Sequence, residues 1–264
     1  MADAKITYNS SVIAELNGGQ TATLKCKGKK MDDDVTVESL GGSGTDERFK
    51  QLVEGTLTEI NDSEIETIRA NAFMYLDTLE MAYIPNVTTI LKQAFFDCGS
   101  LASFSALNVH SVSSQAFYGC RKLKEIKFPK LNSMEAQAFQ YCTELEKVDV
   151  GNVNRVQTQA FTNCNSLKAV IMRNTEEMTT LRATSVFDYC YHFLGTVNST
   201  YNPEGLKDGY FYVPRKWLSD EDETIDYRRA TNWTTLATQF RALEDYTVDG
   251  TTTGELDWEK VNAA

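Results

Sequence analysis

The chain has 264 residues, of which 42% are hydrophobic and 24% charged, and its formal net charge is −11. This composition is ordinary for a globular protein, and the length suffices for one or two buried cores. The negative charge argues against nucleic acid as a partner, because phosphates attract clustered lysine and arginine. No run of about 18 apolar residues occurs and the first residues lack a basic-then-apolar pattern, so we expect neither membrane insertion nor a secretory signal.

Residues 1–40 contain three short alternating stretches, "KITYNSSVIAEL", "QTATLKC" and "DVTVESL". They predict a small antiparallel β module, and "GGSG" at 41–44 predicts a flexible linker after it. The module resembles the leading segment of tail-associated proteins in phages and prophages of Gram-positive bacteria. That segment opens with I-T-Y-N-G-S-x-I-A and has a C-x-G-K-x-M core. "CKGKKM" at 26–31 keeps the core, whereas Ser10 replaces the usual glycine.

The stretch "TDERFKQLVEG" at 45–55 predicts a short helix. Thr45 suits the N-cap, the early acids suit the helix dipole, and Gly55 ends the helix. Apolar residues at 49, 52 and 53 share one face. We expect this helix to cap the repeats that follow it.

Residues 57–193 repeat with a period of 22. Each unit reads roughly L-x-x-φ-x-φ-x-x-φ-x-x-φ-x-x-x-A-F-x-x-C-x-x, where φ is apolar. A sixth, degenerate unit contains Phe187 and Cys190 after a four-residue insertion. The phenylalanines of the five regular units are Phe73, Phe95, Phe117, Phe139 and Phe161.

A unit of this size cannot close a hydrophobic core alone, but stacked units align and bury their apolar positions together. The segment L-x-x-φ-x-φ alternates near its end and predicts a strand. The A-F-x-x-C segment predicts a turn or short helix on the opposite wall. We therefore expect the repeated phenylalanines to form a stacked core.

This pattern resembles the bacterial leucine-rich repeats of the BspA-like type, with their L-x-x-I-x-(I/L)-P…I-x-x-x-A-F-x-x-C units. "IKFP" at 126–129 keeps even the proline. The resemblance implies an α/β solenoid, a right-handed leucine-rich repeat with a parallel β-sheet on its concave wall. The solenoid and its helical N-terminal cap would span residues 45–193.

Five of the six cysteines occupy the same slot of the repeat, which the first unit fills with Leu76. A slot that accepts leucine is apolar, so we expect free thiols that act as packing. A ladder of disulfides is the alternative, because stacked Cα atoms lie about 5 Å apart. No C-x-x-C pair occurs, and His110 and His192 occupy inequivalent places and are expected at the surface, so no zinc site is predicted. The core cysteines of the regular units are Cys98, Cys120, Cys142 and Cys164.

Residues 194–264 predict an α+β C-terminal cap. "GYFYVPRKWL" at 209–218 and "YRRATNWTTLATQFRALEDY" at 227–246 predict strand, helix and helix, then strand. The arrangement resembles caps that follow such repeats in bacterial and phage-encoded proteins. The acidic run "SDEDETID" does not have EF-hand spacing, so a solvated loop is favoured over a calcium site. The expected covering residues are Trp217, Tyr227, Trp233, Leu236 and Phe240.

No catalytic motif or cofactor motif is present: the sequence has no G-x-S-x-G, no phosphate-binding glycine loop and no H-E-x-x-H. We therefore expect no enzyme activity, no cofactor and no metal. A partner would meet the concave sheet, where the non-core strand positions project outward. An ordinary solvated sheet is the alternative. The candidate ligand-binding residues are Met81, Tyr83, Lys127, Lys147, Asp149 and Ile171.

These observations lead to a non-catalytic adhesion module, with a protein or a glycan on a cell surface as its partner. The leading hypothesis places it on a phage or prophage tail, where residues 1–40 dock to the particle and the repeats face outward. The alternatives are a BspA-like bacterial cell-surface adhesin and a purely structural spacer. The expected location is accordingly the virion or the cell surface, and the pattern leaves the oligomeric state open.

Overall fold

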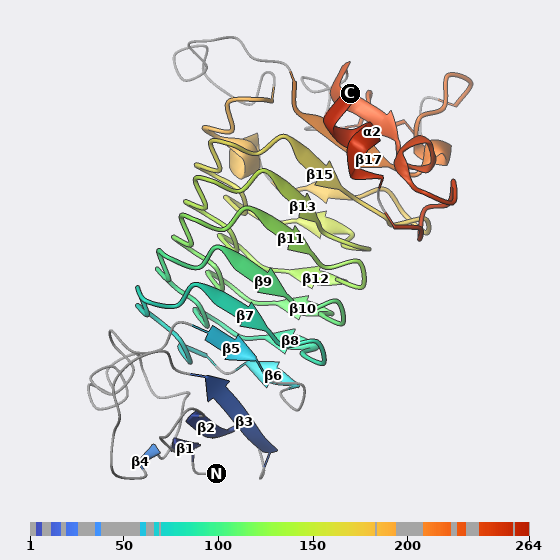
Figure 1. Cartoon of the computed structure of the whole chain (residues 1–264). Helices are drawn as coiled ribbons and strands as arrows, with labels where there is room; N and C mark the ends of the chain where they lie inside the picture. The colour runs from blue at the N-terminus through green and yellow to red at the C-terminus, as the bar shows by residue number, and fades with distance from the viewer. Residues whose placement is uncertain are drawn as a thin grey trace.

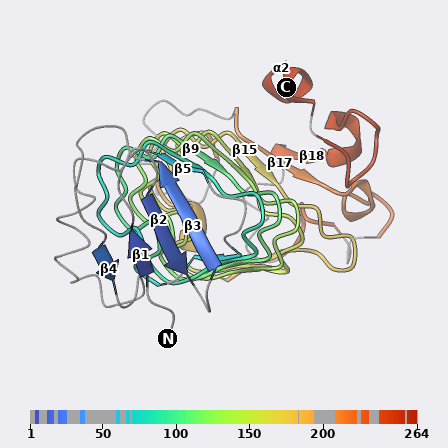
Figure 2. The ribbon, with the colours of Figure 1, turned by 60° about the horizontal axis from the view of Figure 1, so that its bottom comes forward.

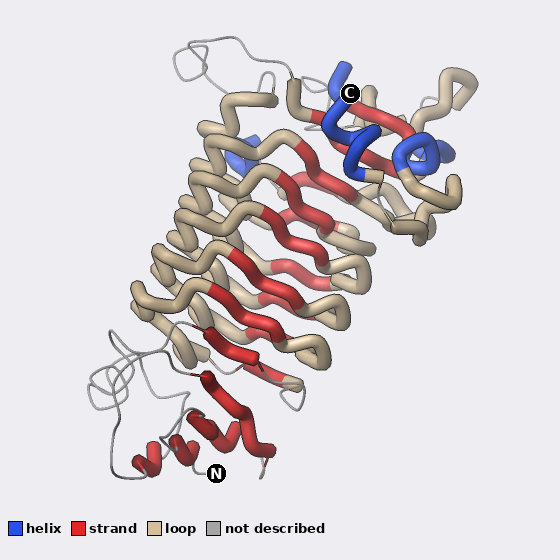
Figure 3. Tube along the Cα trace, viewed as in Figure 1, coloured by secondary structure: helices blue, strands red, loops and turns tan. Residues whose placement is uncertain are grey.

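The computed structural model describes residues 4–6, 12–16, 20–25, 35–37, 59–61, 66–68, 70–182, 184–193, 208–222, 226–230, 238–255 and 257–263. The repeats wind into a solenoid in which two stacks of strands rise from the N-terminal to the C-terminal end (Figures 1 and 3). The prediction of a parallel-sheet solenoid with 22-residue coils is confirmed. The linker predicted at 41–44 and the helix predicted at 45–55 lie outside the described residues.

Each coil contributes one three-residue strand to the main parallel stack, whose hydrogen-bonded ladder divides into two sheets between the third and the fourth of these strands. The Cα partners are one period apart, so that Met81 pairs with Ser103 and Lys147 with Ala169. The middle residue of each strand points into the core, which explains the single apolar position between two variable ones. The strands are β5 (Glu59–Asn61), β7 (Met81–Tyr83), β9 (Ser103–Ser105), β11 (Glu125–Lys127), β13 (Lys147–Asp149) and β15 (Ala169–Ile171).

A second stack of two-residue strands forms another wall of the solenoid (Figure 3). These strands also pair in parallel, and the second residue of each is buried. They are β6 (Thr67–Ile68), β8 (Thr89–Ile90), β10 (Ser111–Val112), β12 (Ser133–Met134), β14 (Arg155–Val156) and β16 (Thr180–Leu181).

The A-F-x-x-C segments form turns, except in the degenerate unit, where η1 (Thr184–Phe187) is a 3-10 helix. Each regular turn places two residues in the left-handed region, for example Gln115 at φ 59° and Gly119 at φ 74°. These residues reverse the chain without forming a helix. Several N–H groups of the turn therefore donate to carbonyls of the next coil, along the solenoid axis. The N–H of Phe117 donates to the carbonyl of Ala138 in the next coil at 2.8 Å.

The repeated phenylalanines and leucines are fully buried and form continuous columns through the core. Phe117 stacks between Phe95 and Phe139, with ring centroids 5.3 Å and 5.2 Å apart. Each fully buried ring contributes about 1.5–3 kcal/mol by burial. The column therefore stabilises neighbouring coils together, as expected of a one-dimensional repeat.

The N-terminal segment contributes β1 (Ala4–Ile6), β2 (Val12–Leu16), β3 (Gln20–Lys25) and β4 (Val35–Val37). β1 pairs with β4 and β2 with β3, both antiparallel. β3 also pairs antiparallel with β5, so it extends the sheet of β5, β7 and β9 past its first coil (Figure 2).

The C-terminal segment adds two more parallel strands to the sheet of β11, β13 and β15. β17 (Tyr210–Val213) pairs with β15, and β18 (Phe240–Ala242) pairs with β17. Tyr227 is fully buried and stacks on Phe240, which closes this end of the core. The chain then forms η5 (Leu243–Tyr246) and the helix α2 (Trp258–Ala263), and neither was anticipated. β17 lies where a strand was predicted and is followed by the short 3-10 helix η2 (Arg215–Trp217), while Trp233 and Leu236 lie outside the described residues.

Candidate binding face

The first and third residues of strands β7 to β15 point away from the core and form the surface that we call the sheet face. Its exposure falls from the N-terminal to the C-terminal end. Met81 and Tyr83 on β7 are 41% and 47% exposed, Lys127 is exposed and Lys147 is half-buried. The sheet face therefore remains open over its first coils.

Ile171 does not face solvent, and here the expectation of an outward-projecting residue is wrong. It is fully buried, together with Ala169, in a second apolar cluster that contains Tyr212, Leu243 and Val261. The last two come from η5 and α2, which cross over the sheet face at β15 and β17 (Figure 1). The C-terminal segment thus covers the last part of the sheet face.

Asp149 is also buried rather than solvent-exposed, for a related reason. Both Nε and Nη2 of Arg173 lie 2.8 Å from Asp149 Oδ2, and the two side chains are only 7% and 4% exposed. Nη1 of Arg173 donates to the carbonyls of Thr252 and Gly254. Burial raises the pKa of the Asp149 carboxyl, while the guanidinium of Arg173 opposes that shift. Asp149 thus holds Arg173, which anchors the C-terminal segment to the sheet.

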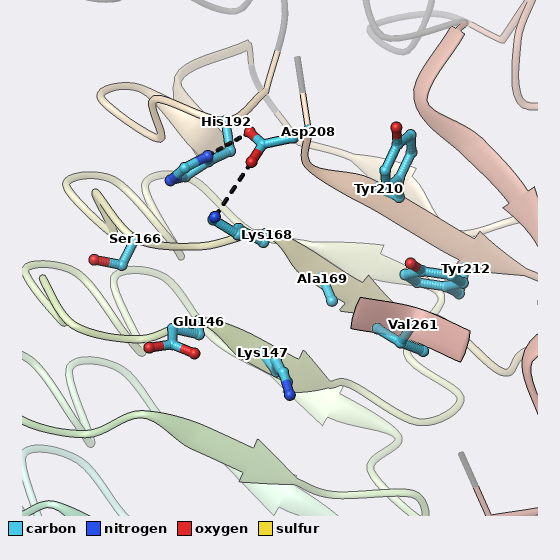
Figure 4. A pocket seen from close by; sticks show the side chains of 10 residues that line it. All are labelled: Glu146, Lys147, Ser166, Lys168, Ala169, His192, Asp208, Tyr210, Tyr212 and Val261. Atoms are coloured by element: carbon cyan, nitrogen blue, oxygen red, sulfur yellow. Dashed lines mark hydrogen bonds and ion pairs between the residues drawn. The ribbon is translucent and has the colours of Figure 1, made fainter. Parts of the chain in front are cut away.

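The covered and open parts of the sheet face meet at a pocket of about 520 Å³, which we call the Tyr210 pocket. Figure 4 shows polar side chains from the last coils on one side and two tyrosines on the other. Lys147 is the one candidate binding residue from the sequence that lies in it. The pocket is lined by Glu146, Lys147, Ser166, Lys168, Ala169, His192, Asp208, Tyr210, Tyr212 and Val261.

Asp208 joins two cations across the Tyr210 pocket. His192 Nδ1 lies 2.6 Å from Asp208 Oδ1, and Lys168 Nζ lies 3.2 Å from Asp208 Oδ2. Partial burial raises the pKa of the Asp208 carboxyl, but the hydrogen bonds from His192 and Lys168 outweigh it and lower the pKa overall. Asp208 therefore remains a carboxylate across the neutral range.

A second pocket of about 490 Å³, the Arg173 pocket, lies where residues 253–255 meet the sheet face. Lys127 and Asp149 take part in it, so the structure places three of the six candidate residues in the two pockets. Met81 and Tyr83 lie apart on β7, and Ile171 is covered. The lining residues are Ser105, Leu107, Lys127, Pro129, Asp149, Arg173, Thr253, Gly254 and Glu255.

The five cysteines that the structure describes are free and buried, and each thiol donates a hydrogen bond to the phenylalanine carbonyl of the preceding coil. Cys142 Sγ, for example, lies 3.1 Å from the carbonyl oxygen of Phe117. Burial raises the pKa of the Cys142 thiol. A neutral, inaccessible thiol is neither a nucleophile nor a metal ligand.

Acidic side chains of the run at 219–226 pair with arginine. Asp226 is fully buried, and Arg228 contacts it and also Asp220 at 2.7 Å. Among the described residues, no group of three or more His, Cys, Asp or Glu side chains could hold a metal ion. Within the same residues, no helix is long and apolar enough to cross a bilayer.

Several residues that line the pockets were not predicted as binding residues from the sequence. His192 was expected at the surface, as His110 is, but its side chain is only 13% exposed and lines the Tyr210 pocket. Asp208 and Tyr210 follow the repeats and have no periodic position. The alternation in "GYFYV" is the only local sign that Tyr210 lies on the same face as Ala169, its Cα partner.

The wall formed by the A-F-x-x-C turns carries a row of aromatic side chains that the sequence analysis did not predict. Tyr75, Phe96, Tyr118 and Tyr141 contact one another in sequence, with ring centroids 5.5, 4.6 and 5.3 Å apart. They follow the core phenylalanines by one or two residues. Tyr75 and Tyr141 remain exposed, so this row offers exposed aromatic residues outside the sheet face for control substitutions.

Comparison with known families identifies the repeat region. Residues 66–194, just under half of the chain, match the BspA type leucine rich repeat region in 6 copies. The predicted BspA-type repeats are therefore confirmed for this region. No curated protein matches the chain.

Two solved structures are similar to the chain. A leucine-rich repeat protein from Bacteroides ovatus ATCC 8483 is 20% identical, with a TM-score of 0.44 over 70% of this chain and 53% of the other. A leucine rich cell surface protein from Faecalibacterium prausnitzii A2-165 is 14% identical, with a TM-score of 0.23 over 73% of this chain and 65% of the other. The chain spans less than two thirds of the length of either protein.

Proposed function

We propose that this chain is a non-catalytic binding module that recognises a ligand on a cell surface through the sheet face. One observation carries the proposal: the sheet face is open over β7 to β11 and ends in two pockets beneath the C-terminal segment. A stacked solenoid presents such a wall as a continuous binding surface. The BspA-type repeats support the same function.

The arrangement of nucleophiles and bases agrees with a binding role. The described thiols are buried and neutral. The imidazole of His192 bonds to Asp208, but no hydrogen bond between it and the hydroxyl of Ser166 is present among the described side chains. Nucleophilic catalysis by this pair would need such an activated hydroxyl.

An array of glycans and cell-surface proteins, probed with the labelled full chain, tests the proposal. The double variant Met81→Ser, Tyr83→Ser should weaken binding to any hit by at least about tenfold, because both side chains are exposed anchors. Tyr141→Ser is the matched control, since this tyrosine is 40% exposed on the opposite wall. Equal binding by both variants would exclude the open part of the sheet face.

We further propose that the module is displayed on a phage or prophage tail, with residues 1–40 docking to the particle. The resemblance of "CKGKKM" and the opening "ITYNSSVIA" to tail-associated segments supports this. Immunogold labelling of phage particles, and of bacterial cells that carry the gene, separates this location from a bacterial cell-surface adhesin. Label on particles that disappears when residues 1–40 are deleted supports tail display. Label on bacterial cells alone supports the adhesin, and a structural spacer would show neither array hits nor variant effects.

A further inference from the structure

Backbone hydrogen bonds hold one side of the Tyr210 pocket together. The N–H of Gly209 donates to the carbonyl of His192 at 3.0 Å, and the N–H of Tyr210 donates to the carbonyl of Lys168 at 2.7 Å. The buried amide of Gln239 donates to the carbonyls of both His192 and Gly209. A Cβ at Gly209 would lie 2.8 Å from the carbonyl oxygen of His192, so the wall is packed tightly. Such support holds polar groups in place before a ligand binds.

One wall of the pocket offers hydrogen-bond donors and acceptors side by side. The Asp208 carboxylate, bridged to His192 and Lys168, is half exposed at the rim, and Glu146 is exposed below it. Lys147 lines the pocket from β13, with its ammonium group directed away from Asp208 (Figure 4). The two carboxylates balance the two ammonium groups, so this wall carries no strong excess of either charge.

The facing wall is aromatic and apolar. The guanidinium of Arg241 lies 4.0 Å from the centroid of the Tyr210 ring and holds that ring in place from outside the pocket lining. Ala169, Tyr212 and Val261 complete this side (Figure 4). The pocket is therefore amphipathic, with a balanced polar wall opposite an aromatic one.

This division matches the chemistry of a sugar ring. A pyranose has hydroxyls around its edge, each both donor and acceptor, and C–H groups on its faces that pack on aromatic rings. A volume of about 520 Å³ lies within the range of small-ligand pockets. A phosphate or sulfate would need an excess of cations, and an extended peptide would need an unpaired strand edge, whereas β13, β15 and β17 are paired to one another.

We propose that the Tyr210 pocket binds one sugar unit of a neutral glycan, with Glu146, Lys168 and Asp208 bonding to hydroxyls and Tyr210 packing on the ring. This deepens the proposed function and rests on it. The open part of the sheet face would then position the rest of the glycan along β7 to β11.

The experiment titrates the ¹⁵N-labelled full chain separately with galactose, mannose and N-acetylglucosamine, and follows amide chemical shifts. N-acetylneuraminic acid, inorganic phosphate and tetra-alanine serve as probes of the competing classes. We expect at least one neutral sugar to shift the amides of residues 166–169 and 208–212. A deoxy analogue that lacks one bonded hydroxyl should bind at least about tenfold more weakly, because its partner is left unpaired.

Glu146→Gln is the diagnostic variant, because Glu146 is exposed and the change preserves its shape. We expect it to weaken the sugar affinity by about tenfold, since a charged hydrogen bond is lost. Glu80→Gln is the matched control, because Glu80 occupies the same repeat slot three coils earlier and is also exposed. The control should bind like the wild type.

The proposal is overturned if no neutral sugar shifts these amides, if phosphate or tetra-alanine does so instead, or if the two variants bind equally. Array binding that persists without any sugar response would reject the pocket assignment and leave the proposed function standing. A sugar response in the pocket with no array hit would support the pocket assignment and reject the proposed recognition of a cell-surface ligand.

Discussion

Arg173 and Asp149 form a buried ion pair between consecutive coils, with Arg173 Nε and Nη2 each 2.8 Å from Asp149 Oδ2. The same guanidinium bonds to the carbonyls of Thr252 and Gly254. One arginine therefore links the sheet to a segment about 80 residues later, and the Arg173 pocket borders this junction. The pair determines where the open sheet face ends.

Arg173→Met should destabilise the protein by about 3–5 kcal/mol, because it leaves the Asp149 carboxylate buried without its cation. Urea denaturation followed by circular dichroism measures the change. The double variant Asp149→Asn, Arg173→Met should lose less unfolding free energy than Arg173→Met alone, because a neutral amide at position 149 can still accept the N–H of Gly151. If the loss of unfolding free energy in the double variant equals the sum of the losses in Asp149→Asn and Arg173→Met, the two side chains do not stabilise each other.

Phe117→Ala should cost about 3–5 kcal/mol of unfolding free energy, because it opens a cavity in the middle of the stacked column. Lys122→Ala, at an exposed position of the same coil, is the control and should stay within about 0.5 kcal/mol. Thermal and urea melts of both variants provide the comparison. A melting temperature like that of the wild type would remove Phe117 from the core.

The periodic part of the fold was predictable, because equivalent positions of successive repeats stack on one another and are buried together. Leu123 recurs at a fixed spacing, and stacking buries every copy of it in one column. The alternation within each strand also predicts which strand residues point away from the core. The repeat carries no information on what covers these residues, so Asp149 and Ile171 were expected in solvent and are buried instead.

The pockets were not predictable for the same reason. Their walls combine repeat positions such as Lys147 with residues such as Asp208 and Val261, which belong to no period. Contacts between segments so far apart leave no local pattern. Lys147 was identified by its outward position in the repeat, whereas nothing in the sequence places His192 beside Asp208.

The Asp208 carboxyl should titrate below its ordinary pKa of 3.8 in the folded protein, and Lys168→Met should raise that pKa. A lowered pKa means that the folded state favours the carboxylate. The contribution of Asp208 to stability is therefore present above pH 3.8 and is lost as the pH falls through the lower, folded pKa. Carbon NMR of the labelled carboxyl group measures both midpoints. Identical midpoints in wild type and variant would show that Lys168 does not interact with Asp208 in solution.

The repeat cysteines should resist a thiol reagent until the protein unfolds. Only the thiolate reacts, and burial both raises the pKa of each described thiol and blocks access to its sulfur. The variant Cys26→Ser removes the one cysteine outside the described residues. In that background, we expect no labelling by 5,5′-dithiobis(2-nitrobenzoate) in buffer at mildly alkaline pH.

The same sample in urea, without reductant, should label all five remaining cysteines, because the structure describes them as free thiols. A ladder of disulfides would instead leave at most one thiol reactive after unfolding. Rapid labelling in buffer would show that at least one sulfur reaches solvent. Either result would contradict the assignment of these cysteines to packing, because each sulfur is placed against a phenylalanine carbonyl of the preceding coil.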